Sequence, residues 1–401
     1  MTDSSSVSQI AFASALSTAV DTSEALEAVC NQALEALGAT PDLAMLFVSA
    51  SHSPQITSLI QQVCRRLGTE RLLGVTGESI VGGGTEIEMQ PAVSLWLARL
   101  PDVTLYTMHL DWQRTPEGGS FVGWPDDLPD QWPEESALVL LGDPFSFPVD
   151  GLLELIDSEQ PGVPIIGGMA SAAQQPRENR LILGTDVFQT GAVAVLIHGA
   201  IRVRTVVSQG CRPIGNHFVV TKSENNVIQE LGGLPAYSRL EEVFLALPPS
   251  DQQLLQKGVH LGRVVSEYQD HFEQGDFLVR NLVGVDPEQG TIAIGDYLRP
   301  GQTVQFHLRD AETADTELRQ LLAAAGEKTS SQIRAALLFT CNGRGTRLFP
   351  NPHHDAAAVQ QILGSIPVSG FFAAGELGPI GGKNFLHGFT ASISLFEEAP
   401  N

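Results

Sequence analysis

A thiol, an amide and a guanidinium lie close together in Cys341-Asn342-Gly343-Arg344, directly after an apolar run of strand type. A second apolar run farther along the chain ends in Gly375-Glu376. Strand ends that release polar side chains into glycine-rich loops are the usual ligand sites of open α/β sheets. Arg344 would bind the carboxylate of an amino acid, and Glu376 would bind its ammonium group. Alternatively, Arg344 and Glu376 pair with each other, or cap turns, and bind no ligand.

Two other places in the sequence have the same character. Gly77-Glu78 ends an earlier apolar run, and Gly210-Cys211-Arg212 lies in a turn-rich stretch. Glu78 and Glu376 could each instead cap a helix or form an ion pair, and Arg212 could brace an interface between domains. The predicted ligand-binding residues are Gly77, Glu78, Gly210, Cys211, Arg212, Cys341, Asn342, Gly343, Arg344, Gly375 and Glu376.

Cys341 is also a candidate nucleophile. Nearby positive charge and backbone N–H groups lower the pKa of a thiol and raise its reactivity. Such a nucleophile also needs a base, for which His353, His354 and His387 are present in the sequence, although it does not place them in space. One alternative function is therefore a cysteine-dependent enzyme of hydrolase type. The other possibility for Cys341 is an inert, half-buried thiol without a catalytic role.

The sequence does not predict a metal or a cofactor. His353 and His354 are adjacent in one loop and rarely converge on one ion in such an arrangement, and Asp355 is typical of a helix N-cap. The run Gly82-Gly83-Gly84 precedes a strand and is not followed by Lys-Ser/Thr, so it lacks the mechanism of a phosphate-binding loop.

Composition and charge limit the partners. The chain has 401 residues, of which 43% are hydrophobic and 17% charged, as in packed globular proteins. A net charge of −23 argues against nucleic acid and acidic membrane surfaces, which attract positive proteins. The four cysteines are far apart, and the N-terminus lacks the basic start of a signal peptide. We therefore expect an acidic, cytoplasmic protein.

The apolar pattern predicts the elements that position these residues. Residues 10–37 are expected to form a helix with a break near Asp21, an N-cap. A unit of strand, helix, strand, glycine-rich loop and strand then occurs three times, beginning near Leu43, Ser136 and Arg334. In the last strand of the first two units, the matched apolar faces are Val93, Leu95 and Leu97, and Val193, Val195 and Ile197. Residues 201–309 are expected to form strands joined by turns, with one hairpin turn at 224–226. These patterns predict an α/β or α+β fold with mixed sheets built from a threefold repeat.

Several motifs resemble the FIST family. GVTGESIVGGGTEIEMQPAVSLWLARLP is similar to its N-terminal domain, expected over residues 1–200. FTCNGRGTRLF and GFFAAGELGPI are similar to its C-terminal domain, expected over residues 201–401. The resemblance implies a cytosolic sensory protein in signal transduction that binds small ligands such as amino acids. Because the sequence contains no kinase, cyclase or receptor segment, the output would come from a separate signalling protein. A protein-interaction platform without a small ligand is the remaining alternative.

Overall fold

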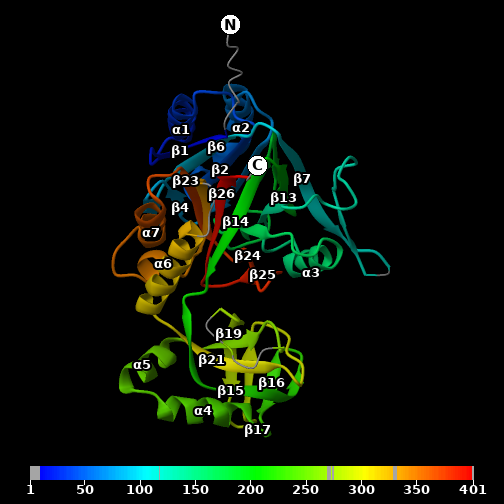
Figure 1. The fold of residues 1–401 in the computed structure, drawn as a ribbon, viewed down its shortest axis with the longest axis vertical. Helices are drawn as coiled ribbons and strands as arrows, with labels where there is room; N and C mark the ends of the chain where they lie inside the picture. Colours follow the sequence, from blue (N-terminus) through cyan, green and yellow to red (C-terminus); the bar gives the residue numbers. More distant parts are fainter. Residues whose placement is uncertain (1–9, 117, 269–271, 273–274, 328–331, 400–401) are drawn as a thin grey trace. The chain divides into compact units, whose positions relative to one another are not determined.

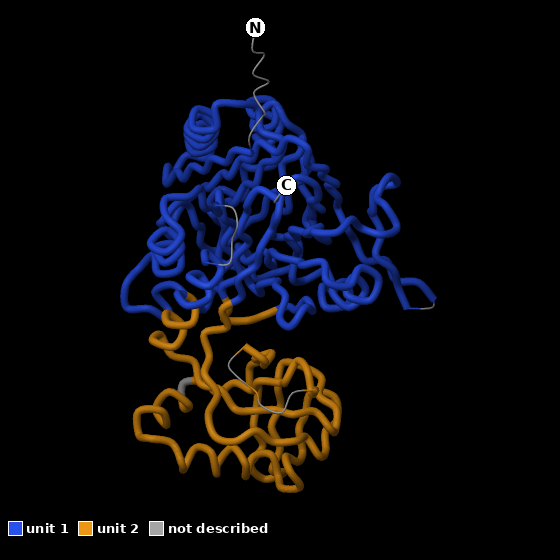
Figure 2. Tube along the Cα trace, viewed as in Figure 1, with its two compact units in different colours: residues 1–207, 319–386, 391–401 blue, residues 208–318, 387–390 orange. Residues whose placement is uncertain are grey.

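The computed structural model describes residues 10–116, 118–268, 272, 275–327 and 332–399. The chain divides into two compact units (Figure 2). Unit 1 takes in residues 1–207, 319–386 and 391–401, and unit 2 takes in residues 208–318 and 387–390. The described residues form four sheets and seven helices, which confirms the predicted mixed α/β class. None of these helices is both long and apolar enough to cross a bilayer.

Unit 1 is built from three sheets (Figure 1). Their strand orders are β1-β6-β2-β3-β11-β12, β25-β24-β10-β9-β13-β7-β8 and β14-β26-β22-β23-β4-β5. The strands are β1 (Ala11–Ser17), β2 (Leu43–Ser49), β3 (Leu72–Gly77), β4 (Ile80–Gly82), β5 (Thr85–Ile87), β6 (Val93–Arg99), β7 (Val103–Gln113), β8 (Ser120–Val122), β9 (Ala137–Gly142), β10 (Ile165–Met169), β11 (Leu181–Leu183), β12 (Asp186–Phe188), β13 (Ala192–Gly199), β14 (Ile201–Ser208), β22 (Ile333–Cys341), β23 (Val368–Ala373), β24 (Glu376–Ile380), β25 (Lys383–His387) and β26 (Ala391–Glu398).

Each of these sheets contains one parallel pair of strands joined by a helix. The pairs are β2 with β3, β9 with β10, and β22 with β23. Their crossover helices are α2 (Ser53–Leu67), α3 (Val149–Glu159) and α7 (His354–Leu363). Parallel neighbours need such a crossover, and it brings both carboxyl ends to the same edge of the sheet. The strands occur in the predicted order, whereas the threefold repeat itself stays a prediction.

Short two-stranded hairpins link the three sheets. The β4–β5 hairpin follows β3 in the chain but pairs with β23 of the third sheet. The β11–β12 hairpin follows β10 but pairs with β3 of the first sheet. The β24–β25 hairpin follows β23, and β24 pairs with β10 of the second sheet. Each of the three sheets thus includes a hairpin that follows, in the chain, a strand of another sheet.

The three sheets share a central apolar core. Alternate side chains point into it, among them Phe47 of β2, Val139 of β9 and Phe339 of β22. The opposite face of the first sheet packs against α2 and α1 (Thr22–Leu37), which lie beside β1 and β6 in Figure 1. The predicted correspondence of faces is wrong, because residues 93, 95 and 97 face these helices whereas residues 193, 195 and 197 face the central core.

The predicted helix over residues 10–37 is wrong in its first part. Residues 11–17 form β1, which pairs with β6 in antiparallel fashion. Burial there mostly alternates from one residue to the next, which is the period of a strand with one covered face. The N-cap at Asp21 is confirmed, since its carboxylate accepts a hydrogen bond from the N–H of Glu24 at 2.9 Å.

Unit 2 contains a closed barrel of six strands. Strand β15 pairs with β21 on one side and with β16 on the other, and β18, β19 and β20 complete the ring. The expected hairpin turn is confirmed between β15 and β16, where Asn225 has a φ of 53°. The strands and helices are β15 (Cys211–Glu224), β16 (Val227–Leu231), β17 (Leu234–Pro235), β18 (His260–Val264), β19 (Phe277–Asp286), β20 (Thr291–Ile294), β21 (Thr303–Arg309), α4 (Ala236–Ala246) and α5 (Pro249–Lys257); α6 (Ala311–Glu327) follows β21.

Candidate functional site

The carboxyl ends of β3, β10 and β23 are hydrogen-bonded to one another in unit 1. The N–H of Ser171, after β10, donates to the carbonyl of Thr76 in β3 at 3.2 Å. The N–H of Ala374, after β23, donates to the carbonyl of Met169 in β10 at 2.9 Å. Three sheets therefore place their parallel-strand ends at one locus, where an α/β fold most often binds ligands.

Glu78 and Arg347 form an ion pair at this locus. Glu78 follows β3, and its N–H donates to Oγ of Ser171 at 2.9 Å. Arg347 closes a 3₁₀ turn, Gly345–Arg347, and donates to both carboxylate oxygens of Glu78, at 2.7 and 3.0 Å. The Arg347 side chain is 47% exposed and that of Glu78 is 26% exposed. A dissolved molecule can therefore reach both charges.

Asn342 and Met89 flank this pair. The carbonyl of Asn342 accepts a hydrogen bond from Nη1 of Arg347 at 2.7 Å. With its amide nitrogen turned inward, Asn342 also donates to the carboxylate of Glu78 at 3.1 Å. The sulfur of Met89 lies 3.6 Å from Nη2 of Arg347, and Met89 is 69% exposed with a φ of 51°. A non-glycine residue keeps such a backbone only where its surroundings impose it. The site thus combines two charges, an amide and an exposed thioether.

Arg344 points away from this surface. Its side chain is fully buried, and it donates from Nε and Nη2 to the two carboxylate oxygens of Asp355, at 2.7 and 2.8 Å. Burial alone would raise the pKa of Asp355, but Arg344 and hydrogen bonds from Arg344 and His354 hold that pKa well below its usual value. The expected N-cap role of Asp355 is wrong, because the helix N-cap is His353 and Asp355 binds Arg344 instead. Arg344 thus fastens the loop after β22 to α7.

Gly77, Gly375 and Glu376 are part of the backbone around the same strand ends. A Cβ atom on Gly77 would lie 2.9 Å from the ring of Phe371, so the strand end needs glycine there. The carbonyl of Gly375 accepts the N–H of Met169 at 2.8 Å. Glu376 is fully buried in β24 of the second sheet, whereas Arg344 follows β22 of the third.

Gly210, Cys211 and Arg212 belong to unit 2. The N–H of Gly210 donates to Glu317 at 2.7 Å, and Cys211 is buried. Arg212 bridges Asp251 at 2.8 Å and Asp310 at 3.0 Å. Arg212 therefore braces α5 and the start of α6 against β15.

The thiol of Cys341 is largely covered. Its side chain is buried, and Sγ accepts the N–H of Gly343 at 3.4 Å. Two of the candidate bases contact other groups, since Nδ1 of His353 lies 3.0 Å from the N of Glu86 and Nδ1 of His354 lies 2.9 Å from Asp355. The third candidate, His387, lies in unit 2. The hydrogen bond between Gly343 and the thiol of Cys341 helps to shape the loop that carries Asn342.

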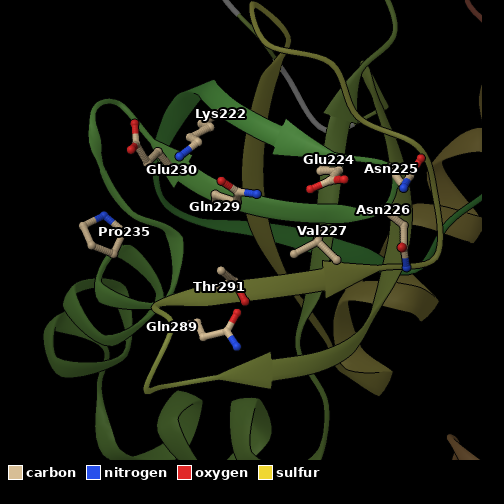
Figure 3. A pocket seen from close by; sticks show the side chains of 10 residues that line it. All are labelled: Lys222, Glu224, Asn225, Asn226, Val227, Gln229, Glu230, Pro235, Gln289 and Thr291. Carbon is tan, nitrogen blue, oxygen red and sulfur yellow. The ribbon is translucent and has the colours of Figure 1, made fainter.

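A hollow of about 540 Å³ lies elsewhere, on the barrel of unit 2 (Figure 3). The residues that line it include Lys222, Glu224, Glu230, Asn225, Gln229 and Thr291. Its charges have opposite signs, and none of the predicted site residues lines it.

Sequence reasoning missed Arg347, Ser171, Glu86 and the pairing of Asp355. The signal for Arg347 was its place three residues after Arg344 in the same loop. Which of Arg344 and Arg347 stays at the surface depends on the ion pair between Asp355 and Arg344. That pair forms only because of how α7 packs, which the local sequence does not show.

Comparison with known proteins agrees with the resemblance. The FIST N domain model matches residues 42–234, and the FIST C domain model matches residues 236–379. The chain is 43% identical to uncharacterized protein MT0656 of Mycobacterium tuberculosis, over 95% of this chain and 98% of that protein. It is 40% identical to uncharacterized protein Mb0898c of Mycobacterium bovis, over 93% of this chain and 95% of that protein. The domain borders expected at residues 200 and 201 stay predictions.

Proposed function

Because the chain belongs to the FIST family, whose domains are associated with sensory signal transduction, we propose that it senses a small charged molecule bound at Glu78, Asn342 and Arg347. The proposed ligand class is amino acids and similar zwitterions. Such a sensor would act in the cytoplasm and pass its signal to a separate output protein.

The observation that carries this proposal is the exposed Glu78–Arg347 pair at the meeting point of three strand ends. A ligand carboxylate would take the guanidinium of Arg347 as a two-pronged partner, and a ligand ammonium would take the carboxylate of Glu78. Opening the existing pair costs little, since exposed ion pairs contribute about 0–1 kcal/mol. Binding therefore replaces one weak contact by two.

Other predicted residues of unit 1 support this site in the proposal. Gly77 lets the end of β3 approach Phe371 closely, and Arg344 fixes the loop that carries Gly343 and Asn342. A site built on strand ends is held more rigidly than one on free loops. Specificity then comes from the separation of the two charges, with Met89 beside the ligand's side chain.

A thermal-shift screen tests the proposal. Amino acids and small carboxylates are added at increasing concentration, and a binder stabilises the folded form by about 2.7 kcal/mol at a hundredfold excess over its Kd. The variants Arg347→Met and Glu78→Gln should lose the shift. Arg65→Met, on the exposed side of α2, is the matched control and should keep it.

Two results would count against this function. One is the absence of any shift in the wild-type protein across the screen. The other is a shift that survives intact in Arg347→Met, which would place binding elsewhere, for instance in the hollow of unit 2.

A further inference from the structure

Glu86 is a carboxylic acid almost entirely enclosed by protein. It lies on β5 and is 2% exposed. Its Oε1 accepts the N–H of Ala356, in the first turn of α7, at 2.9 Å. Its Oε2 is buried and has no hydrogen-bond partner within the described parts of the chain. A carboxylate that is ionised and half-satisfied in such a place is costly, so the geometry favours the protonated acid.

The acidic groups around Glu86 have the same effect. Asp355 on α7 and Glu88 just beyond β5 both raise the pKa of Glu86, whereas the guanidinium of Arg344, bound to Asp355, lowers it by a smaller amount. His353 contacts the backbone of Glu86, and His354 contacts Asp355. Strand β4, the partner of β5, contributes Ile80–Gly82 and no charge. Burial and then the charge of Asp355 raise the pKa of Glu86 to about 8.

The segment that carries Glu86 also holds the proposed ligand site. We define residues 86–89 as the strap. Glu88 accepts hydrogen bonds from the N–H of Thr346 at 2.9 Å and from its hydroxyl at 2.6 Å. Thr346 precedes Arg347 in the same 3₁₀ turn, and Met89 contacts Arg347 directly. The strap is therefore fixed at Glu86 to α7 and at Glu88 to the turn that presents Arg347.

We propose that the protonation state of Glu86 controls how firmly the ligand site is held, and we call this device the catch. While Glu86 keeps its proton, the strap stays seated on α7 and holds the turn of Arg347 in place. When the proton is lost to solvent, repulsion between Glu86, Asp355 and Glu88 unseats the strap and loosens that turn. The consequence for sensing rests on the proposed function, whereas the catch exists with or without a ligand.

A metal ion bridging these acids is not the better explanation. Within the described residues, no group of three or more His, Cys, Asp or Glu side chains is placed to hold a metal. Arg344 already supplies the positive charge at Asp355. A proton is therefore the cation that fits Glu86.

Hydrogen–deuterium exchange tests the catch without any ligand. Exchange of a peptide covering residues 343–348 is measured at pH 7 and pH 9 and corrected for the intrinsic rate. We expect a rise of more than about threefold in the wild-type protein at pH 9. Glu86→Gln imitates the protonated acid and should remove the rise, whereas the exposed Glu35→Gln on α1 should behave as wild type. A peptide from β9 should stay unchanged, which shows that unit 1 remains folded.

The outcomes separate the two proposals. A flat exchange rate in the wild-type protein, or an equal rise in Glu86→Gln, overturns the catch even if ligand binding depends on Arg347. A pH-dependent rise that Glu86→Gln removes supports the catch even if the thermal screen finds no binder.

Discussion

The guanidinium of Arg344 and the carboxylate of Asp355 form a two-pronged ion pair that is closed to solvent, with 0% and 1% of the side chains exposed. Thr340, near the end of β22, donates to the same carboxylate at 2.6 Å. The pair thus joins a strand, the loop after it and the first turn of α7. It determines which arginine of the loop remains available at the surface.

Removing one partner of this pair should be strongly destabilising. In Arg344→Met the carboxylate of Asp355 stays buried without its cation, which typically costs about 3–5 kcal/mol. Urea unfolding of the wild-type protein and the variant measures the loss. The double variant Arg344→Met with Asp355→Leu should lose less than Arg344→Met alone, because no buried charge remains. A loss below about 1 kcal/mol in the single variant would show that the pair does not anchor the loop.

The Glu78–Arg347 pair should behave in the opposite way. Both side chains are partly exposed, so solvent screens their attraction. We expect Glu78→Gln and Arg347→Met to change the free energy of unfolding by no more than about 1 kcal/mol. A loss as large as that of Arg344→Met would identify the pair as a structural element and weaken its assignment to a ligand.

Acid should destabilise the barrel of unit 2 through two histidines. Burial lowers the pKa of His307 to about 4, and burial with the charge of Arg309 lowers that of His260 to about 4. Since an unfolded histidine titrates near pH 6.5, the unfolded chain takes up protons first as the pH falls. Stability is full above about pH 6.5 and is lost towards pH 4, by on the order of 3 kcal/mol for each histidine.

Exchange protection in β18 and β21, followed from pH 7.5 to pH 4.5, measures this loss. His307→Gln removes one titrating group and should flatten the pH profile relative to the wild-type protein. An unchanged slope in that variant would show that other groups cause the acid sensitivity.

Gly370 should tolerate no side chain. A Cβ atom there would lie 1.8 Å from the carbonyl oxygen of Leu338 on the neighbouring strand. Gly370→Ala must therefore separate β22 from β23, and we expect a loss above about 3 kcal/mol or failure to fold. Gly284→Ala is the matched control, because its Cβ would meet no atom within 4 Å. Equal Tm values for the two variants would disprove this close approach.

Cys341 should react slowly with thiol reagents in the folded protein. It is 9% exposed, which hinders access of a reagent to Sγ. Burial raises the pKa of Cys30 and Cys64 to about 11, so these two thiols stay protonated at neutral pH. Labelling at pH 7 followed by mass spectrometry should show each of them slower than a free thiol and fast after denaturation. Rapid labelling of Cys341 would instead favour the cysteine-hydrolase alternative.

Local patterns were enough to predict several elements of the fold. The N-cap at Asp21 and the turn around Asn225 depend on neighbouring residues alone, so the sequence contains their full cause. The strand ends at Gly77 and Cys341 follow from apolar runs that stop at polar loops. The mixed α/β class follows from the alternation of such runs with helical patterns.

Features that depend on distant partners were not predictable in this way. The run of residues 11–17 is apolar enough for either state, and its pairing with β6 makes it a strand. Asp355 has the local pattern of a cap, but a buried Arg344 outcompetes that role. The closure of the barrel by β15 and β16 likewise depends on which strands meet.

The exchange of hairpins among the three sheets has a consequence for synthesis of the protein. The second sheet needs β24, which the ribosome makes after all the barrel strands of unit 2, and the third sheet needs β4, made near the start. An emerging chain must therefore keep early strand edges unpaired until its last stretch appears. Such late, long-range pairing slows folding and leaves unpaired strand edges that are prone to aggregate. A prematurely terminated chain should therefore depend heavily on chaperones.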